Sequence, residues 1–173
     1  MSHFPFMIDL AGETALLVGD VAEQKAELLS SFGCCIQRRA VLTEELLDAI
    51  APALVVIARG DARNETWACL CRERGILVNV VDEPALCTFF FPAVIRRGDL
   101  TVAVSTGGAS PAAAALLRRH IESSLPDATE VILDWAREEK LRLREMGVLK
   151  QAVDAAFTLG RPLTEEELAD LKA

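Results

Sequence analysis

Basic residues, aromatic residues and long apolar runs are all scarce in this chain of 173 residues. Its 18 lysines and arginines are outnumbered by 26 aspartates and glutamates, which gives a formal net charge of −8. Nucleic acids and anionic membranes attract cationic surfaces, so neither partner is expected. Aromatic residues make up 5% of the chain and tyrosine is absent, which argues against stacking platforms for bases. No segment approaches the roughly 18 consecutive apolar residues of a membrane span.

The cysteines and histidines have no spacing that favours a disulfide framework or a metal site. An odd number of cysteines, behind an N-terminus without a basic and then apolar leader, predicts reduced thiols in a cytoplasmic protein. Cys69 and Cys71 stand two residues apart in a helical pattern, so they point in different directions and disfavour zinc. The two histidines lack a spaced partner, which makes a histidine-based site improbable.

Apolar runs typical of buried strands alternate with helical patterns in the first half of the chain. Strands are predicted over residues 14–18, 34–37, 54–58 and 76–81, and helices over 21–32, 43–52 and 63–74. This alternation predicts an α/β fold, a Rossmann-like parallel sheet with helices on both faces. Ligands bind such sheets beyond the carboxyl ends of the strands, which places residues 19–20, 58–61 and 82–83 on one rim.

The pattern changes after residue 82. Strands are predicted over 89–95 and 100–104, joined by a turn at 96–99. A loop of small residues, 105–111, leads into a helix over 112–123 with Ser110 as its N-cap. The remainder is predicted to be helical, with breaks near Gly147 and Gly160 and a capping box that begins at Thr164.

A single glycine, Gly19, ends the first strand at the turn where dinucleotide-binding proteins hold a pyrophosphate. The N-terminus of the next helix offers free N–H groups and a positive partial charge there. The G-x-G-x-x-G fingerprint has three glycines, whereas here Asp20 follows Gly19 directly. Asp20 could cap the helix, but its carboxylate would repel a phosphate. Nucleotide binding and an ordinary turn both remain open.

Three other segments also allow two interpretations each. Loop 105–111, with two glycines and three hydroxyl side chains, could cradle carboxylates or could be an ordinary capped connection. Asp82, at the end of a buried strand, could act as a base or metal ligand, or could form a plain turn with the residues that follow. Arg96 and Arg97 could clamp a substrate anion or lie in an exposed turn.

Taken together, these segments resemble the precorrin-2 dehydrogenase family, the dehydrogenase and often ferrochelatase module of siroheme synthase. The resemblance is strongest over 74–126, where the NVVD and STGGASP motifs occur. It implies a Rossmann-like NAD-binding domain at 1–88, a dimerisation segment with the substrate loop at 89–126, and a helical domain at 127–173. It also implies a homodimer that oxidises precorrin-2 to sirohydrochlorin with NAD. In some members iron or cobalt insertion follows.

The resemblance also assigns roles to particular residues. It implies that Asp82 is the catalytic carboxylate, and it places Thr106 where some members carry a regulatory serine. A polycarboxylate tetrapyrrole needs local basic residues, and the candidates are Arg96, Arg97, Arg118 and Arg119. The implied cofactor contacts are Gly19, Asp20, Val21, Val41 and Leu42, and the implied substrate contacts are Ser105, Thr106, Gly107, Gly108 and Ser110.

The chain departs from the family pattern on the cofactor side. The family turn reads V-G-G-G-x-V-A, which is longer and richer in glycine than residues 18–22 of this chain. The segment before the strand at 54–58 is also shorter, so one strand of the sheet is expected to be missing or abbreviated. Because of these departures an alternative function stays open beside the dehydrogenase, that of a tetrapyrrole-binding or chelatase homologue without NAD-dependent activity. Arg38 and Arg39, at the end of the second strand, leave NAD and NADP both open.

Overall fold

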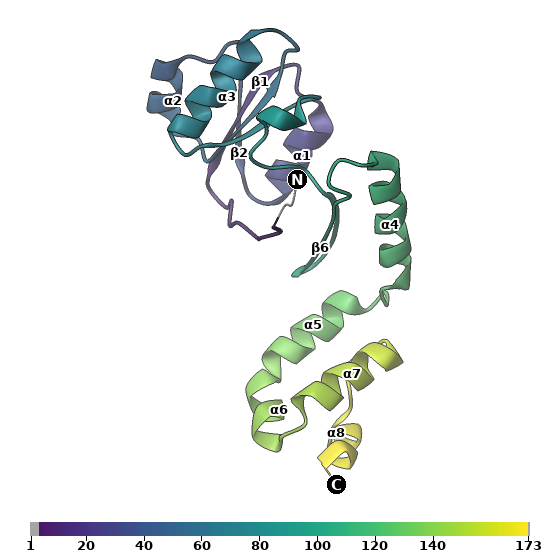
Figure 1. Ribbon diagram of the computed structural model, residues 1–173. Coiled ribbons are helices and arrows are strands. Elements are labelled where there is room, and N and C mark those ends of the chain that lie inside the picture. The colour runs from purple at the N-terminus through teal and green to yellow at the C-terminus, as the bar shows by residue number, and fades with distance from the viewer. Residues whose placement is uncertain (1–3, 173) are drawn as a thin grey trace. The chain divides into compact units, whose positions relative to one another are not determined.

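The strands of the first half pair into one parallel sheet (Figure 1). The computed structural model describes residues 4–172, and the chain divides into two units, residues 1–91 and 92–173. The elements of the first unit are β1 (Thr14–Gly19), α1 (Glu23–Ser31), β2 (Cys35–Arg39), α2 (Glu44–Ile50), β3 (Leu54–Ala58), α3 (Arg63–Glu73), β4 (Leu77–Val80) and the 3-10 helix η1 (Pro84–Leu86). The strand order is β2-β1-β3-β4 and every pair is parallel. The Rossmann-like fold that the sequence predicts is therefore confirmed.

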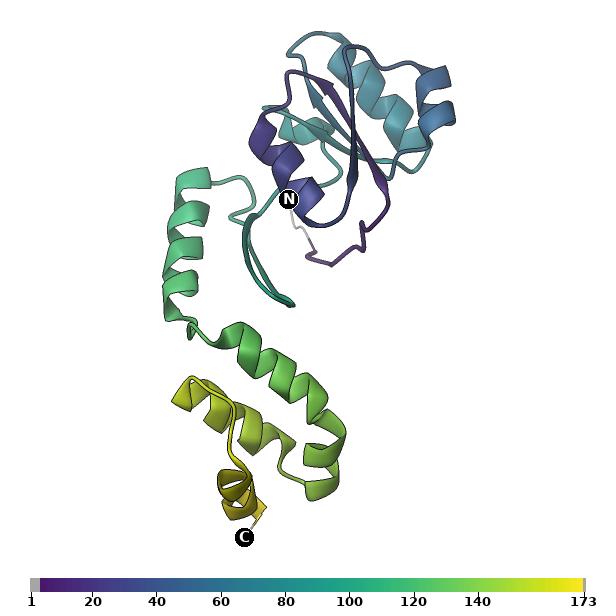
Figure 2. The ribbon, with the colours of Figure 1, turned by 180° about the vertical axis from the view of Figure 1, so that it is seen from behind.

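Both faces of this sheet are buried. Along β1, Leu16 and Val18 face a core shared with α2 and α3, whereas Ala15 and Leu17 face a core shared with α1. This alternation is the period-two geometry of a strand. Figure 2, seen from behind, shows α1 on the opposite side of the sheet from α2 and α3. Because both faces are covered, the strands read as continuous apolar runs.

The chain crosses over β1 between β2 and β3. Helix α1 leads from β1 to β2 at one edge, whereas α2 leads from β2 back across to β3 on the other side of β1. Connections that leave β1 and β3 in opposite directions open a crevice at the carboxyl ends of these strands, where such sheets bind ligands. Between β2 and β3, where every residue is described, the chain forms α2 and no strand, as the short segment predicted.

The second unit combines a hairpin with a set of helices. Its elements are β5 (Ala93–Arg97), β6 (Leu100–Val104), α4 (Pro111–Ser124), α5 (Thr129–Glu138), α6 (Lys140–Met146), α7 (Leu149–Leu159) and α8 (Glu165–Lys172). β5 and β6 are antiparallel, and α4 packs against both. The last four helices share a separate apolar core that includes Ile132, Leu143 and Leu168. Within residues 4–172 no helix has the length and apolar character of a membrane span.

The first strand of the hairpin begins later than predicted, at Ala93 rather than at residue 89. Phe89 and Phe91 pack instead against the core beneath α1 in the first unit. Their rings meet edge to face at 5.3 Å. Pro92 then separates them from β5, and a proline has no N–H for a ladder hydrogen bond. The three phenylalanines therefore end the first unit instead of starting the second.

The turn of the hairpin is shorter than predicted. Arg96 and Arg97 pair with Thr101 and Leu100 inside the ladder, which leaves Gly98-Asp99 as a two-residue turn. Arg97 donates to the carbonyl of Pro126 at 3.2 Å, so it anchors the segment before α5 rather than extending into an exposed turn. The prediction of a turn at 96–99 was wrong for both arginines.

The helix ends agree with the sequence analysis. Ser110 caps α4 by accepting from the N–H of Ala113, and α6 and α7 end at glycines with left-handed φ, Gly147 and Gly160. Thr164 and Glu167 exchange the reciprocal hydrogen bonds of a capping box. The two units meet in sequence after residue 91, close to the expected domain boundary at 88. The separation of 89–126 from 127–173 stays a prediction.

Replacing Leu143 by alanine should destabilise the helices of the second unit. Leu143 of α6 is fully buried, and deleting a buried leucine side chain costs about 2–5 kcal/mol. Leu141 lies on the same helix with 73% of its surface exposed, so Leu141→Ala is the matched control. We expect the control to change the free energy of unfolding by less than about 0.5 kcal/mol. Urea denaturation measures both, and equal losses in the two variants would contradict the assigned core.

Candidate functional site

A hollow of about 440 Å³ lies at the carboxyl ends of β1, β2 and β3. This is the crevice expected where the chain crosses over β1. Its volume falls within the range of about 300–1,000 Å³ that is common for small-molecule sites. The lining residues follow the three strands in turn: Gly19 and Asp20; Arg38, Arg39 and Ala40; Ala58 and Arg59. We call this the switch-point hollow.

The turn after β1 is packed tightly against the end of β3. Gly19 has a φ of +83°, and a Cβ there would lie 2.5 Å from the carbonyl oxygen of Ala58 and 2.6 Å from Cγ of Arg59. The N–H of Asp20 donates to the same carbonyl at 3.0 Å. Position 19 therefore requires a glycine for two reasons, the positive φ of its backbone and the close approach of β3.

The first turn of α1 has no side-chain cap. Its N-cap residue is Ala22, which offers no acceptor, and Asp20 does not take that role. The interpretation of Asp20 as a helix cap was therefore wrong. Uncapped N–H groups at a helix N-terminus are donors for an anion, and the helix dipole adds to the attraction. The turn thus keeps the features that receive a phosphate, although the Asp20 carboxylate opposes one.

Arginines give the switch-point hollow a positive lining. Arg38 pairs with Glu23 at 2.6 Å, and Arg59 pairs with Asp61 at 3.2 Å while donating to the carbonyl of Ala40 at 2.8 Å. Arg39 donates to the carbonyl of Arg38 and to the Gln37 amide, and it forms no ion pair within the described part of the chain. Arg39 is therefore the cation of this hollow that no carboxylate neutralises.

An ion-pair network holds the loop after β3. Asp61 accepts from the N–H of Arg63 at 3.0 Å and from its guanidinium at 2.7 Å. Hydrogen bonds from Arg63, and then from Arg59, hold the pKa of Asp61 well below its usual range. The carboxylate is therefore charged at neutral pH and fixes Arg59 at the edge of the hollow.

The remaining cofactor residues implied by the resemblance lie in different environments. Val21 is buried in the core beneath α1, and Leu42 is buried in the core beneath α2 and α3. Val41 is 44% exposed. Val21 and Leu42 can therefore approach a ligand only with their backbone atoms. Their role in cofactor binding stays a prediction.

Asp82 lies just after β4, on the same rim of the sheet as the switch-point hollow. Its φ is +62°, a left-handed conformation that aspartate tolerates better than most residues. The side chain is exposed, and the N–H of Val81 donates to the carbonyl of Ile57 at 2.9 Å, which continues the sheet up to the turn. A strained, exposed carboxylate at a strand end is typical of functional positions.

Buried polar groups fix the turn that carries Asp82. The Cys87 thiol accepts from the N–H of Val80 at 3.2 Å and donates toward the carbonyl of Val80 at 3.3 Å. Burial raises the pKa of Cys87, so the thiol stays protonated and able to donate. On the other side, the buried Asn64 of α3 donates to the Glu83 carboxylate at 2.5 Å. The backbone of Val80 and the side chain of Glu83, on either side of Asp82, are thereby both held in place.

Lys25 of α1 reaches the same strand end from the opposite side of the sheet. Its ammonium donates to Oδ1 of Asn79 at 3.1 Å and lies 5.0 Å from the centre of the Phe91 ring. Desolvation lowers the pKa of Lys25, while the nearby Asp82 carboxylate opposes that shift. The sequence analysis missed this lysine. Its signal was the helical spacing from Ala22, Ala26 and Leu29, which places it beside the buried stripe of α1.

Loop 105–111 lies in the second unit, and its side chains bond to its own backbone. Thr106 accepts from the N–H of Ser110 and donates to its carbonyl, both at 3.1 Å, and Ser105 accepts from the N–H of Gly107 at 3.2 Å. Gly107 and Gly108 have positive φ, and nothing lies within 4 Å of a Cβ on either. The glycines therefore serve the turn, and their backbone faces open space.

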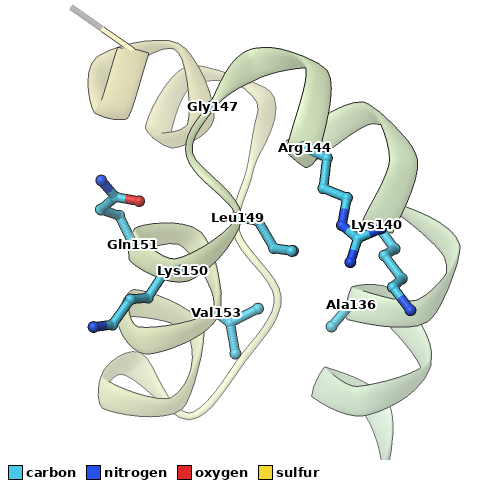
Figure 3. A pocket seen from close by; sticks show the side chains of 8 residues that line it. All are labelled: Ala136, Lys140, Arg144, Gly147, Leu149, Lys150, Gln151 and Val153. Carbon is cyan, nitrogen blue, oxygen red and sulfur yellow. The ribbon is translucent and has the colours of Figure 1, made fainter.

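A second hollow of about 600 Å³ lies between helices of the second unit (Figure 3). Leu149 and Val153 of α7 point toward Ala136 of α5, whereas Lys150 points away. None of the catalytic, cofactor or substrate residues implied by the resemblance lines it. Among residues 4–172 there is also no group of three or more histidine, cysteine, aspartate or glutamate side chains that could hold a metal ion.

Two protein families and several known proteins match this chain in sequence. The family described as the sirohaem biosynthesis protein central region matches residues 97–124, and the putative NAD(P)-binding family matches residues 35–93. A siroheme synthase of Stutzerimonas stutzeri is 32% identical over 98% of this chain, and one of Citrobacter koseri is 32% identical over the whole chain. Over nearly its whole length the chain is thus similar to siroheme synthases. It spans 42% and 44% of these two relatives, so it corresponds to less than half of each.

The solved structure of SirC, a precorrin-2 dehydrogenase, has the same fold. Its TM-score is 0.60 over 98% of this chain and 96% of SirC, at 19% identity. The NAD(P)-binding match begins at residue 35 and therefore excludes the Gly19 turn. The Gly19 turn, which departs most clearly from the siroheme synthase pattern, thus lies outside the residues that this family matches.

Gly19→Ala should destabilise the first unit more than Gly12→Ala. Both glycines have φ near +80°, but a Cβ at position 12 meets nothing within 4 Å whereas one at position 19 meets Ala58. Backbone strain costs about 1–2 kcal/mol in each variant, and the clash should add about 1–3 kcal/mol to Gly19→Ala alone. Thermal unfolding measures the difference. Equal destabilisation would show that the turn does not pack on β3 as described.

Proposed function

We propose that this chain acts in siroheme biosynthesis and oxidises precorrin-2 to sirohydrochlorin with a nicotinamide dinucleotide, NAD in the first instance. One observation carries the proposal. Asp82 is held in a left-handed turn on the same rim of the sheet as the switch-point hollow. Kinship with siroheme synthases and the fold shared with SirC support the choice of substrate.

The reaction removes one hydride and one proton from the macrocycle. A bound nicotinamide supplies the chemistry of hydride acceptance. We assign the proton to the Asp82 carboxylate, which then releases it to solvent. As an exposed carboxylate on a fixed turn, Asp82 can approach a carbon-bound or nitrogen-bound proton of a ligand over this rim. Atoms and charge then balance, with one hydride and one proton leaving precorrin-2.

Lys25 and Asn64 would serve as positioning residues. Lys25 is tied to Asn79 on β4, and Asn64 is tied to Glu83, so each fixes one end of the segment that presents Asp82. Such support matters because a catalytic group held loosely loses much of its advantage. Cys87 completes the support from within the turn.

Residues 105–110 are proposed to receive the carboxylates of the tetrapyrrole. The open backbone at Gly107 and Gly108, together with the N-terminus of α4 capped by Ser110, supports this role. Thr106 is committed to Ser110, so it would shape the loop rather than bind the substrate through its hydroxyl. Insertion of iron or cobalt into the product at the same site is a further activity that we propose. We place the whole pathway in the cytoplasm.

A specific observation favours a second candidate function. The Asp20 carboxylate lines the hollow in which a pyrophosphate would lie, and a single glycine precedes it. A homologue that binds a tetrapyrrole, or inserts a metal ion into it, without the dinucleotide would have this turn. Calorimetric titration with NAD and with NADP separates the two functions, because the second predicts that neither binds at millimolar concentration.

Asp82→Asn should abolish oxidation of precorrin-2 in the presence of NAD. Asparagine keeps the volume and tolerates positive φ, so the turn should fold, but it cannot accept the proton. We expect turnover to fall by about 100-fold or more, the usual contribution of a general base. Asp154→Asn, on the exposed face of α7, is the control. Turnover equal to that of the wild type in Asp82→Asn would refute the assigned role. Sirohydrochlorin binding without wild-type turnover would favour the second function.

The second unit also supports a homodimer. β5 and β6 form a sheet of only two strands, which is marginally stable on its own. Leu116 and Leu117 of α4 are 48% and 47% exposed. A second copy that pairs with the hairpin would extend the sheet and cover these leucines.

Leu117→Asp should therefore weaken self-association. A buried, unpaired carboxylate in an interface is costly, and we expect the dimer dissociation constant to rise by about tenfold or more. Leu159→Asp, at the end of α7 and 52% exposed, is the matched control. Sedimentation velocity measures the oligomeric state. A wild-type monomer, or an unchanged dimer in Leu117→Asp, would reject this interface.

A further inference from the structure

We infer that the switch-point hollow selects a dinucleotide with a 2′-phosphate on its adenosine ribose, NADP in preference to NAD. The inference rests on the proposed function and concerns which dinucleotide the site takes. The key residue is Arg39, with Arg38 and Arg59 beside it.

The position of Arg39 in the chain is the first argument. In dinucleotide-binding sheets the residue that reads the ribose 2′ position lies at the end of the second strand, about 20 residues after the glycine turn. A carboxylate there accepts from the 2′-hydroxyl of NAD, whereas an arginine there accommodates the 2′-phosphate of NADP. Arg39 is the last residue of β2 and stands 20 residues after Gly19.

No carboxylate lies near the end of β2 that could accept from the 2′-hydroxyl of NAD. Residues 37–43 contain none, and the first acidic residue after β2 is Glu44, on α2. Glu44 is paired with Arg74 at 2.9 Å and is therefore engaged with the end of α3. Asp20 is the one carboxylate among the residues that line the hollow, and it follows β1, on the pyrophosphate side of the turn. Nothing in the hollow is placed to accept from a 2′-hydroxyl.

The charges around Arg39 give the second argument. Arg38 and Arg59 have carboxylate partners, whereas Arg39 has none within residues 4–172. Its Nη atoms bond to a carbonyl and an amide oxygen, contacts that leave its positive charge uncompensated. Arg59 donates to Ala40, so the strand ends that carry both arginines are tied together. A phosphate with a charge near −2 is the ligand group that this arrangement favours.

Titration calorimetry of the whole chain with NADP and with NAD, at equal ionic strength, tests the inference. We expect NADP to bind about tenfold more tightly, the worth of one charge-assisted hydrogen bond to an exposed group. Adenosine 2′,5′-bisphosphate and 5′-AMP, compared in the same way, examine the adenosine half without the nicotinamide. The preference should shrink when the ionic strength rises from about 0.01 M to about 0.1 M, because the screening length falls about threefold.

Variants of Arg39 test the residue itself. Arg39→Gln should weaken NADP binding by about tenfold and change NAD binding by less than about twofold. Arg39→Asp should reverse the preference, since a carboxylate repels the phosphate and can accept from the 2′-hydroxyl. Lys150→Gln removes one positive charge from an exposed site on α7 and is the control for net charge. Arg39 is exposed, so these variants should fold, and circular dichroism verifies this.

The outcomes separate the inference from the proposed function. Tighter binding of NADP that is lost in Arg39→Gln but kept in Lys150→Gln supports it. Equal binding of the two dinucleotides, or tighter binding of NAD, overturns the inference and leaves the dehydrogenase function in place. Binding of neither dinucleotide overturns both. An equal loss of NADP affinity in Arg39→Gln and Lys150→Gln would mean that net charge, not this residue, governs the preference.

Discussion

The close contact between the Gly19 turn and the end of β3 is the constraint on which the site depends. The Ala58 carbonyl accepts from Asp20, and the space that a Cβ on Gly19 would need is taken by Ala58 and Arg59. This contact fixes the end of β1 against the end of β3, and β2 and β4 pair outward from them. The positions of the arginine-lined hollow and of the Asp82 turn both depend on this pair of strand ends. A looser turn would change the geometry of every group on the rim.

The local chemistry of the chain predicts much of this arrangement. Continuous apolar runs mark β1, β3 and β4 because both faces of the sheet are covered. The caps at Thr43, Ser110 and Thr164 follow from side chains that bond to nearby backbone. Prediction fails where distant packing decides. Phe89 and Phe91 have strand-like character, but the core beneath α1 takes them, and β5 starts only after Pro92.

The candidate site, too, is predictable from the sequence only in part. The Gly19 turn and Asp82 are visible in the sequence because a glycine and a carboxylate follow buried strands. Lys25 and Asn64 join the site only through tertiary contacts over long sequence separations, such as the bond from Lys25 to Asn79. Val21 and Leu42 stand at sequence positions implied for the cofactor, yet their side chains complete the two cores. An acidic chain thus concentrates cations at one rim by folding, which its net charge of −8 does not reveal.

The contact between Lys25 and Phe91 has a mechanical consequence. Phe91 is the last residue of the first unit, and its ring lies against an ammonium that is bonded to Asn79 on the strand leading to Asp82. The polypeptide link to the unit that bears the 105–111 loop therefore has its fixed end one side chain away from that strand. Through Lys25, this end of the link is held to β4. The boundary between the two units in sequence is therefore anchored in the core of the first unit.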